Sequence, residues 1–185
     1  MIQLGLNIMN RPRVCLHRSA LLLAVLATQA FANWQEALPG AQIIGAGEFQ
    51  MFGFDVYNAR LWSASRPLTP GQPFALELIY QRRISRQDLV QASVDEIKRL
   101  SGAAVSAEQL DRWRAQMQQS FVDVQAGTRI TGVYLPGQGV RFFVGQQLQH
   151  EVKDPAFAQA FFDIWLDQRT RNPELRQQLL GIAKP

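Results

Sequence analysis

Three arginines stand close together where binding of an anion is possible. Arg82, Arg83 and Arg86 lie between a strand predicted over residues 74–80 and a helix that Ser85 begins. Guanidinium groups bind carboxylates through paired, charge-assisted hydrogen bonds, so this turn could hold a carboxylate. The alternative is a solvated surface turn, although cations at the start of a helix oppose the helix dipole.

Hydroxyl groups on neighbouring elements could complete such a site. Tyr57 and Tyr80 fall on two predicted strands, and Ser93 falls within the apolar face of a predicted helix. Together with Arg83 they are our candidates for binding a small ligand, as cleft lining and as contacts for a polar head group. Such a ligand would be apolar or amphipathic.

Catalytic and metal-binding patterns are scarce. His150 is the only histidine beyond residue 32, so a His-x-x-x-His metal site is excluded there and a histidine-based triad has one candidate base. Strand alternation places His150 beside Leu148 and Val152, which favours a half-exposed histidine with its hydrogen bonds satisfied. No Gly-x-Ser-x-Gly elbow occurs. We predict no catalytic residue, no metal site and no cofactor.

The sequence Gly45-Ala46-Gly47 superficially resembles a phosphate-binding loop. A third glycine is missing at the required spacing, and the segment that follows has the pattern of a strand, so no helix N-terminus is available for a phosphate. We predict instead a turn or bulge that precedes a long strand.

The N-terminal residues have the pattern of a secretory signal peptide. Three arginines precede a short apolar run at residues 20–27, and Ala30 and Ala32 form a small-x-small site for cleavage before Asn33. The run is much shorter than the roughly 20 residues of a spanning helix, which excludes a membrane anchor. We expect a signal peptide at 1–32, one domain at 33–185 and a periplasmic location. The alternative is a buried N-terminal helix of a cytoplasmic protein.

Cleavage would change the charge of the chain. The full sequence carries 19 basic and 15 acidic residues, and the predicted signal peptide removes three arginines and no acidic residue, so the net charge falls from +4 to +1. This value argues against electrostatic binding to nucleic acid or to anionic lipid. Cys15 leaves with the peptide, so the mature chain has no disulfide and no thiol.

Alternation of apolar and polar residues predicts strands in two parts of the chain. Residues 51–62 and 74–80 alternate with period two and are expected to be neighbouring antiparallel strands. Three shorter strands are expected at 129–134, 140–144 and 147–152. Their short connections favour a meander.

Four helices with start signals interrupt these strands. The residues that begin them are Ser85, Ser106, Asp154 and Asn172. Ser85 with Asp88 forms a capping pattern, and a proline directly follows both Asp154 and Asn172. The helices have apolar faces that a sheet can bury, so we predict an α+β fold with helices packed on one face of an antiparallel sheet.

Large aromatic residues gather in or beside the predicted strands. They are Phe52, Phe54, Tyr57, Trp62, Phe74, Tyr80, Phe142 and Phe143. Two interpretations remain open: an aromatic core, or a cleft between sheet and helices that is lined for an apolar ligand.

The run Gly-Phe-Asp-Val-Tyr-Asn-Ala-Arg-Leu-Trp at residues 53–62 is the most distinctive string of the chain. With the segments 47–62, 76–100, 130–137 and 157–167, it resembles secreted bacterial chalcone isomerase-like proteins. The resemblance covers nearly all of the predicted mature chain. It implies an open-faced sandwich in which a sheet and helices surround a hydrophobic cleft.

The resemblance also concerns activity. Plant enzymes of this family close a flavanone ring with an arginine, a threonine, a tyrosine and an asparagine. The corresponding positions here lie within 47–50, near Phe52, near Ser85 and near Ala92, and none carries the family residue. The enolate charge that develops during this reaction needs a cationic or hydrogen-bonding group.

Other branches of the family bind fatty acids or have no catalytic activity. Our first hypothesis is therefore a periplasmic, non-catalytic protein that binds an apolar or amphipathic molecule such as a fatty acid. The alternatives are a cofactor-independent isomerase or lyase with rearranged residues, and a structural or partner-binding module of the cell envelope.

Overall fold

The computed structural model describes residues 33–182. The predicted signal peptide, with Ala30 and Ala32, lies outside these residues. Asn33 begins the described part, and its side chain caps the short helix η1 (Trp34–Ala37) by accepting a hydrogen bond from the Gln35 amide.

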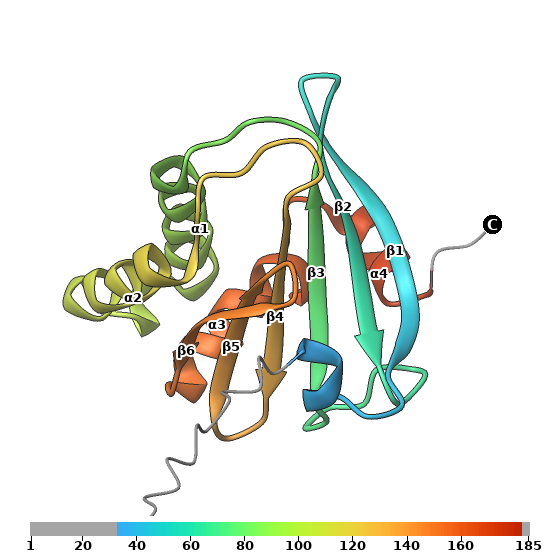
Figure 1. The fold of residues 1–185 in the computed structure, drawn as a ribbon. Helices are drawn as coiled ribbons and strands as arrows, with labels where there is room; N and C mark the ends of the chain where they lie inside the picture. Colours follow the sequence, from blue (N-terminus) through green and yellow to red (C-terminus); the bar gives the residue numbers. More distant parts are fainter. Residues whose placement is uncertain (1–32, 183–185) are drawn as a thin grey trace, which may run out of the picture. The chain divides into compact units, whose positions relative to one another are not determined.

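Six strands form one antiparallel sheet in which each strand pairs with the next along the chain (Figure 1). The strands are β1 (Gln42–Met51), β2 (Phe54–Ser63), β3 (Phe74–Tyr80), β4 (Arg129–Leu135), β5 (Gly139–Val144) and β6 (Gln147–Val152). The meander predicted for the three later strands is confirmed.

Helices pack on one face of this sheet, as expected for the predicted α+β class. α3 (Pro155–Leu166) lies against β4 and β5, α4 (Pro173–Leu179) against β1 and β2, and α2 (Ala107–Ser120) against β6. α1 (Arg86–Ser101) packs on α2 and α3, and the short, exposed η2 (Gly102–Ala104) follows it. Three of the expected caps form, in which the side chains of Ser85, Ser106 and Asp154 accept hydrogen bonds from amides of the first helical turn. Among residues 33–182, no helix is both long enough and apolar enough to cross a bilayer.

Aromatic rings fill the layer between the sheet and α3. Phe142 of β5 lies edge-on to Phe121 and Phe161, with ring centroids 5.5 and 5.1 Å apart, and Phe162 packs against Phe74 of β3. Edge-to-face contacts of this kind stabilise a core beyond the burial of area alone. The aromatic-core interpretation is therefore correct for these strand residues.

The opposite face of the sheet is covered in part by η1 (Figure 1). Trp34 packs edge-on against Trp62 at 5.1 Å, and Phe143 belongs to the same small cluster. Beside this cluster, Glu77 is only 4% exposed and its carboxylate lies 3.1 Å from Arg129 and 3.7 Å from Arg60. The charge of Glu77 is thus compensated across three strands.

Two predictions about the first strands are wrong. The alternation over 51–62 does not mark one strand, because Phe52 and Gly53 form the turn between β1 and β2. Gly45 and Gly47 lie inside β1 rather than in a turn before it, although a register shift between Ile43 and Gly45 agrees with the expected bulge. A Cβ atom at Gly45 would collide with the Leu179 carbonyl, so glycine lets α4 approach the strand closely.

The prediction for His150 is correct in one part and wrong in another. His150 is half-buried, and its Nε2 lies 2.9 Å from Gln116 Oε1, as expected for a satisfied histidine. Leu148, however, does not share its face. A register shift between Phe142 and Phe143 pairs Leu148 with Phe143 on the opposite side of the sheet.

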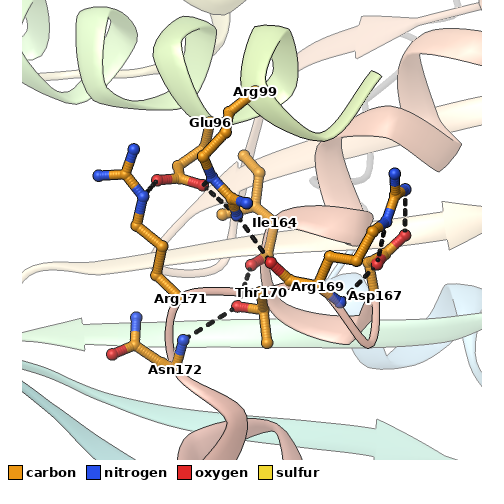
Figure 2. Close-up of polar contacts among 8 residues, drawn as sticks. All are labelled: Glu96, Arg99, Ile164, Asp167, Arg169, Thr170, Arg171 and Asn172. Carbon is orange, nitrogen blue, oxygen red and sulfur yellow. Dashed lines mark hydrogen bonds and ion pairs between the residues drawn. The ribbon is translucent and has the colours of Figure 1, made fainter. Parts of the chain in front are cut away.

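Ion pairs anchor the connection between α3 and α4 to α1 (Figure 2). Glu96 of α1 pairs with both Arg99 and Arg171 at 2.8 Å, and Arg99 donates to the backbone carbonyl of Arg169 at 3.0 Å. Arg169 in turn forms a two-pronged contact with Asp167. Each arginine side chain of this connection therefore has a carboxylate partner.

Candidate ligand-binding site

Two connections run side by side at one end of the sheet, one from β3 to α1 and the other from α2 to β4 (Figure 1). Ile84 and Val124 join them through two backbone hydrogen bonds of 3.1 and 2.9 Å. Nearer the sheet, the Tyr80 amide donates to the Thr128 carbonyl at 2.9 Å. These bonds fix both segments and build the frame of a pocket.

A pocket of about 380 Å³ lies between the two connections. Its lining residues are Arg83, Ile84, Ser85, Asp123, Val124, Gln125 and Thr128. Pockets for small molecules typically measure about 300–1,000 Å³, so this one can hold a small ligand or one end of a longer one. The lining combines the half-buried aliphatic side chain of Ile84 with charged and hydroxyl groups, as an amphipathic ligand requires.

Arg83 is the cation of this pocket. Its side chain is exposed, and within the described part of the chain it takes part in no ion pair. Thr128 Oγ1 accepts a hydrogen bond from the Gln125 amide at 3.0 Å and can still donate its own proton. Arg83 and Thr128 can therefore both donate to an anionic oxygen in the pocket.

The acidic group of the pocket has a structural role. Asp123 accepts a hydrogen bond of 2.7 Å from the Arg86 amide in the first turn of α1. Ser85 Oγ is also engaged, because it donates to the Asp88 carboxylate at 2.6 Å and accepts from the Asp88 amide. These two residues hold the start of α1, and the guanidinium of Arg83 remains available for a ligand.

Tyr57 of β2 and Tyr80 of β3 are directly paired at the end of the sheet next to the pocket, where the Tyr80 amide binds the carbonyl of the lining residue Thr128. Their ring centroids are 5.9 Å apart, and Phe49 of β1 stacks on Tyr57 at 5.0 Å. Trp165 Nε1 donates to the Tyr57 hydroxyl at 2.9 Å. The structure thus brings both tyrosines together in one aromatic cluster that joins β1, β2, β3 and α3.

Burial raises the pKa of both tyrosines. For Tyr57 the loss of hydration outweighs the hydrogen bond from Trp165, which alone would lower the pKa. For Tyr80 burial is again the largest cause, and the neighbouring Tyr57 adds to it. Both phenols are neutral at ordinary pH, so they can make hydrogen bonds but are poor bases.

Ser93 does not line the pocket. Its hydroxyl donates to the Leu89 carbonyl one turn earlier in α1 at 2.8 Å, a common local bond for serine within a helix. Of the four predicted ligand residues, the structure therefore places Arg83 in the pocket, Tyr57 and Tyr80 in the adjacent aromatic cluster, and Ser93 on the half-buried side of α1.

The α2–β4 connection contributes pocket residues that the sequence patterns did not predict. Asp123 and Thr128 lie in a segment without strand or helix periodicity, and Asp123 contacts Arg86 across 37 positions. A signal was available, since a chain that leaves β3 and returns as its neighbour β4 must bring its exit and return segments close together. Among residues 33–182, no three histidine, cysteine, aspartate or glutamate side chains gather as metal ligands would.

Comparison with known families and structures decides the relationship. A family model described as chalcone isomerase-like matches residues 42–181, which is most of the chain. The chain belongs to the chalcone isomerase-like family. The resemblance noted at residues 53–62 is thereby confirmed at the level of the family.

Among solved structures, the chain is similar to the crystal structure of the Arabidopsis thaliana fatty-acid binding protein AtFAP1. The TM-score is 0.60 with 12% sequence identity, and the match covers 77% of this chain and 88% of that one. At this identity the similarity establishes the fold of the chalcone isomerase-like protein and leaves its ligand open. A comparison with curated proteins finds no match.

Proposed function

We propose that this chalcone isomerase-like protein binds a fatty acid without catalysing a reaction. The observation that carries the proposal is the pocket of about 380 Å³ in which Arg83 is exposed and has no ion-pair partner among residues 33–182. A carboxylate there would receive hydrogen bonds from the guanidinium and from Thr128. Ile84, which is half-buried, offers an apolar contact to the first part of the alkyl chain.

Two further observations support this proposal. The similar structure AtFAP1 is named a fatty-acid binding protein. None of the four positions that correspond to the catalytic residues of the plant enzymes carries the family residue, which favours binding over isomerisation.

The location belongs to the same proposal. The signal-peptide pattern at 1–32 supports export to the periplasm and a mature chain that begins at Asn33. The mass of the purified secreted protein tests this step. Removal of residues 1–32 supports it, and an intact chain recovered from the cytosol contradicts it.

Titration calorimetry tests the ligand. The mature protein, freed of lipid, is titrated with dodecanoate and with dodecanol, which has the same chain without the carboxylate. We expect one saturable site for dodecanoate and affinity for the alcohol that is weaker by about 10-fold or more, because the charged hydrogen bonds are lost. The absence of binding by both compounds, with no thermal stabilisation, would overturn the proposal.

A separate assay tests the claim that catalysis is absent. The protein is incubated at high concentration with chalcone, and the visible absorbance of chalcone is followed. We expect a flat trace. A decay that depends on protein concentration would favour the isomerase alternative.

A further inference from the structure

The hairpin between β1 and β2 ends in a cluster of exposed apolar side chains. Met51 is 49% exposed, Phe52 92% and Phe54 64%. Figure 1 shows this hairpin extending past the end of β3, so its tip stands clear of the neighbouring strands. Large apolar groups in contact with water are costly to maintain, and gathered at one projecting point they indicate a surface that becomes covered.

The conformation of the turn strengthens this indication. Phe52 has a φ of 52° and Gly53 a φ of 78°, so both central residues of the turn lie in the left-handed region. Turns of this kind favour Asn-Gly, because asparagine tolerates the left-handed conformation far better than a bulky side chain. A phenylalanine at position 52 is thus unfavourable in two ways, because its backbone is in the left-handed region and its apolar ring is exposed to water. A residue that is unfavourable in both respects is typical of a functional position.

The base of the tip is rigid and carries a cation. Phe49 stacks on Tyr57 below the turn at 5.0 Å, and the guanidinium carbon of Arg82 lies 5.6 Å from the centre of the Phe54 ring. Asp55 accepts a hydrogen bond of 2.7 Å from Gln50 across the hairpin. An arginine held over an aromatic ring is well placed to bind a phosphate while the ring enters an apolar layer.

We infer that the tip formed by Met51, Phe52 and Phe54 inserts into the surface of a phospholipid bilayer, with Arg82 at the level of the phosphates. A stable protein interface involves about 20–30 residues on each side, far more than a two-residue turn and its flanks present. A bilayer can cover an isolated aromatic tip on all sides, which a flat protein surface cannot. Attachment is local, so it does not require the high net positive charge that the chain lacks.

The inference stands apart from the proposed function, because it concerns the protein's attachment to lipid and not the content of its pocket. Both sites nevertheless lie at the same end of the sheet, since Arg82 at the tip is followed directly by Arg83 in the pocket. A bilayer at the tip would therefore bring a source of fatty acid next to the proposed site.

Co-sedimentation with vesicles of phosphatidylethanolamine and phosphatidylglycerol tests the inference on the mature protein. We expect the wild type to bind at both low and high salt. The substitution Phe52→Asn places the preferred residue in the turn, so the thermal midpoint should stay equal or rise while the vesicle partition coefficient falls by about 10-fold or more. Phe52→Trp should retain binding, and Arg82→Gln should weaken it several-fold.

Leu148→Thr is the matched control. Leu148 is 45% exposed on β6, away from the tip, and its substitution should leave vesicle binding unchanged. Wild-type protein that stays in the supernatant would overturn the inference, and so would Phe52→Asn binding vesicles as well as the wild type. A protein that instead forms dimers without lipid, and loses them on Phe52→Asn, would show that the tip binds a second copy.

Discussion

Two arginine-rich connections of the molecule differ in how their charges are compensated. In the α3–α4 connection, Arg169 and Arg171 are paired with Asp167 and Glu96 (Figure 2). In the β3–α1 connection, Arg82 lies over an aromatic ring and Arg83 faces a pocket, and within residues 33–182 neither forms an ion pair. Both connections link the end of one element to the start of a helix, so the difference lies in their carboxylate partners.

This contrast separates arginines that hold the fold from arginines that are available to a ligand. A paired guanidinium has its hydrogen bonds satisfied within the chain, whereas a free guanidinium can satisfy them with a carboxylate or a phosphate. Substitutions in the first connection should therefore change stability, and substitutions in the second should change binding.

The largest expected effect is on binding at the free connection. Arg83→Ala should weaken dodecanoate binding by about 10- to 100-fold, because charged hydrogen bonds to the carboxylate are lost. Its thermal midpoint should stay close to that of the wild type. Arg171→Ala is the matched control from the paired connection and should leave dodecanoate affinity unchanged in the same titration. If both variants lose the same amount of dodecanoate affinity, the two connections do not differ in ligand binding as proposed.

An intermediate effect is expected on stability at the paired connection. Glu96 is 20% exposed and pairs with both Arg99 and Arg171. Glu96→Gln removes the negative charge that both arginines contact, so it should lower the free energy of unfolding by about 1 kcal/mol. For a domain of this size the thermal midpoint would fall by about 2–4 °C. Calorimetry measures the shift.

Glu108→Gln is the control for the thermal-midpoint shift of Glu96→Gln. Glu108 pairs with Arg112 inside α2, but its side chain is 86% exposed, so the substitution should have almost no effect on the thermal midpoint. If the two substitutions lower the thermal midpoint equally, the ion pairs of Glu96 do not anchor the α3–α4 connection.

The last effect depends on pH. The hydrogen bond from Arg169 lowers the pKa of Asp167 to about 2. The unfolded chain has a higher value near 3.9, so the ion pair stabilises the fold above about pH 4 and loses this contribution as pH falls toward 2. Urea unfolding of wild type and Asp167→Asn should show a stability gap at pH 6 that closes toward pH 2. A gap that widens on acidification would contradict the assigned ion pair.

Local signals account for the elements that the sequence predicted correctly. The starts of three helices could be predicted from their capping residues Ser85, Ser106 and Asp154, because a cap involves only neighbouring residues. The strands β3 to β6 follow from alternation and short connections. β1 escaped prediction because Gly45 and Gly47 interrupt its apolar pattern, and the reason for those glycines is α4, which lies far away in sequence.

The turn at Phe52 was not predicted for a different reason. The aromatic alternation of Phe52 and Phe54 continues through the tip, so it has the pattern of a buried strand face although both side chains are exposed. Alternation reports the period of the backbone and not whether another element covers it. The Gly53 beside Phe52 was the available turn signal.

The candidate site was predicted only in part. Arg83 could be found because three arginines in one turn are visible in the sequence. Asp123 and Thr128 have no such local signal, since the antiparallel pairing of β3 with β4 is what brings their segment to Arg83. Sequence proximity thus identified one wall of the pocket, and the fold supplied the other.

One titration series tests the central claim that Arg83 binds the carboxylate of a fatty acid. Wild type and Arg83→Ala are each titrated with dodecanoate and dodecanol, which gives a cycle of four affinities. We predict that the wild type prefers dodecanoate by about 10-fold or more and that Arg83→Ala binds both compounds equally. A variant that keeps the full preference for dodecanoate would show that the carboxylate lies elsewhere and would contradict the account.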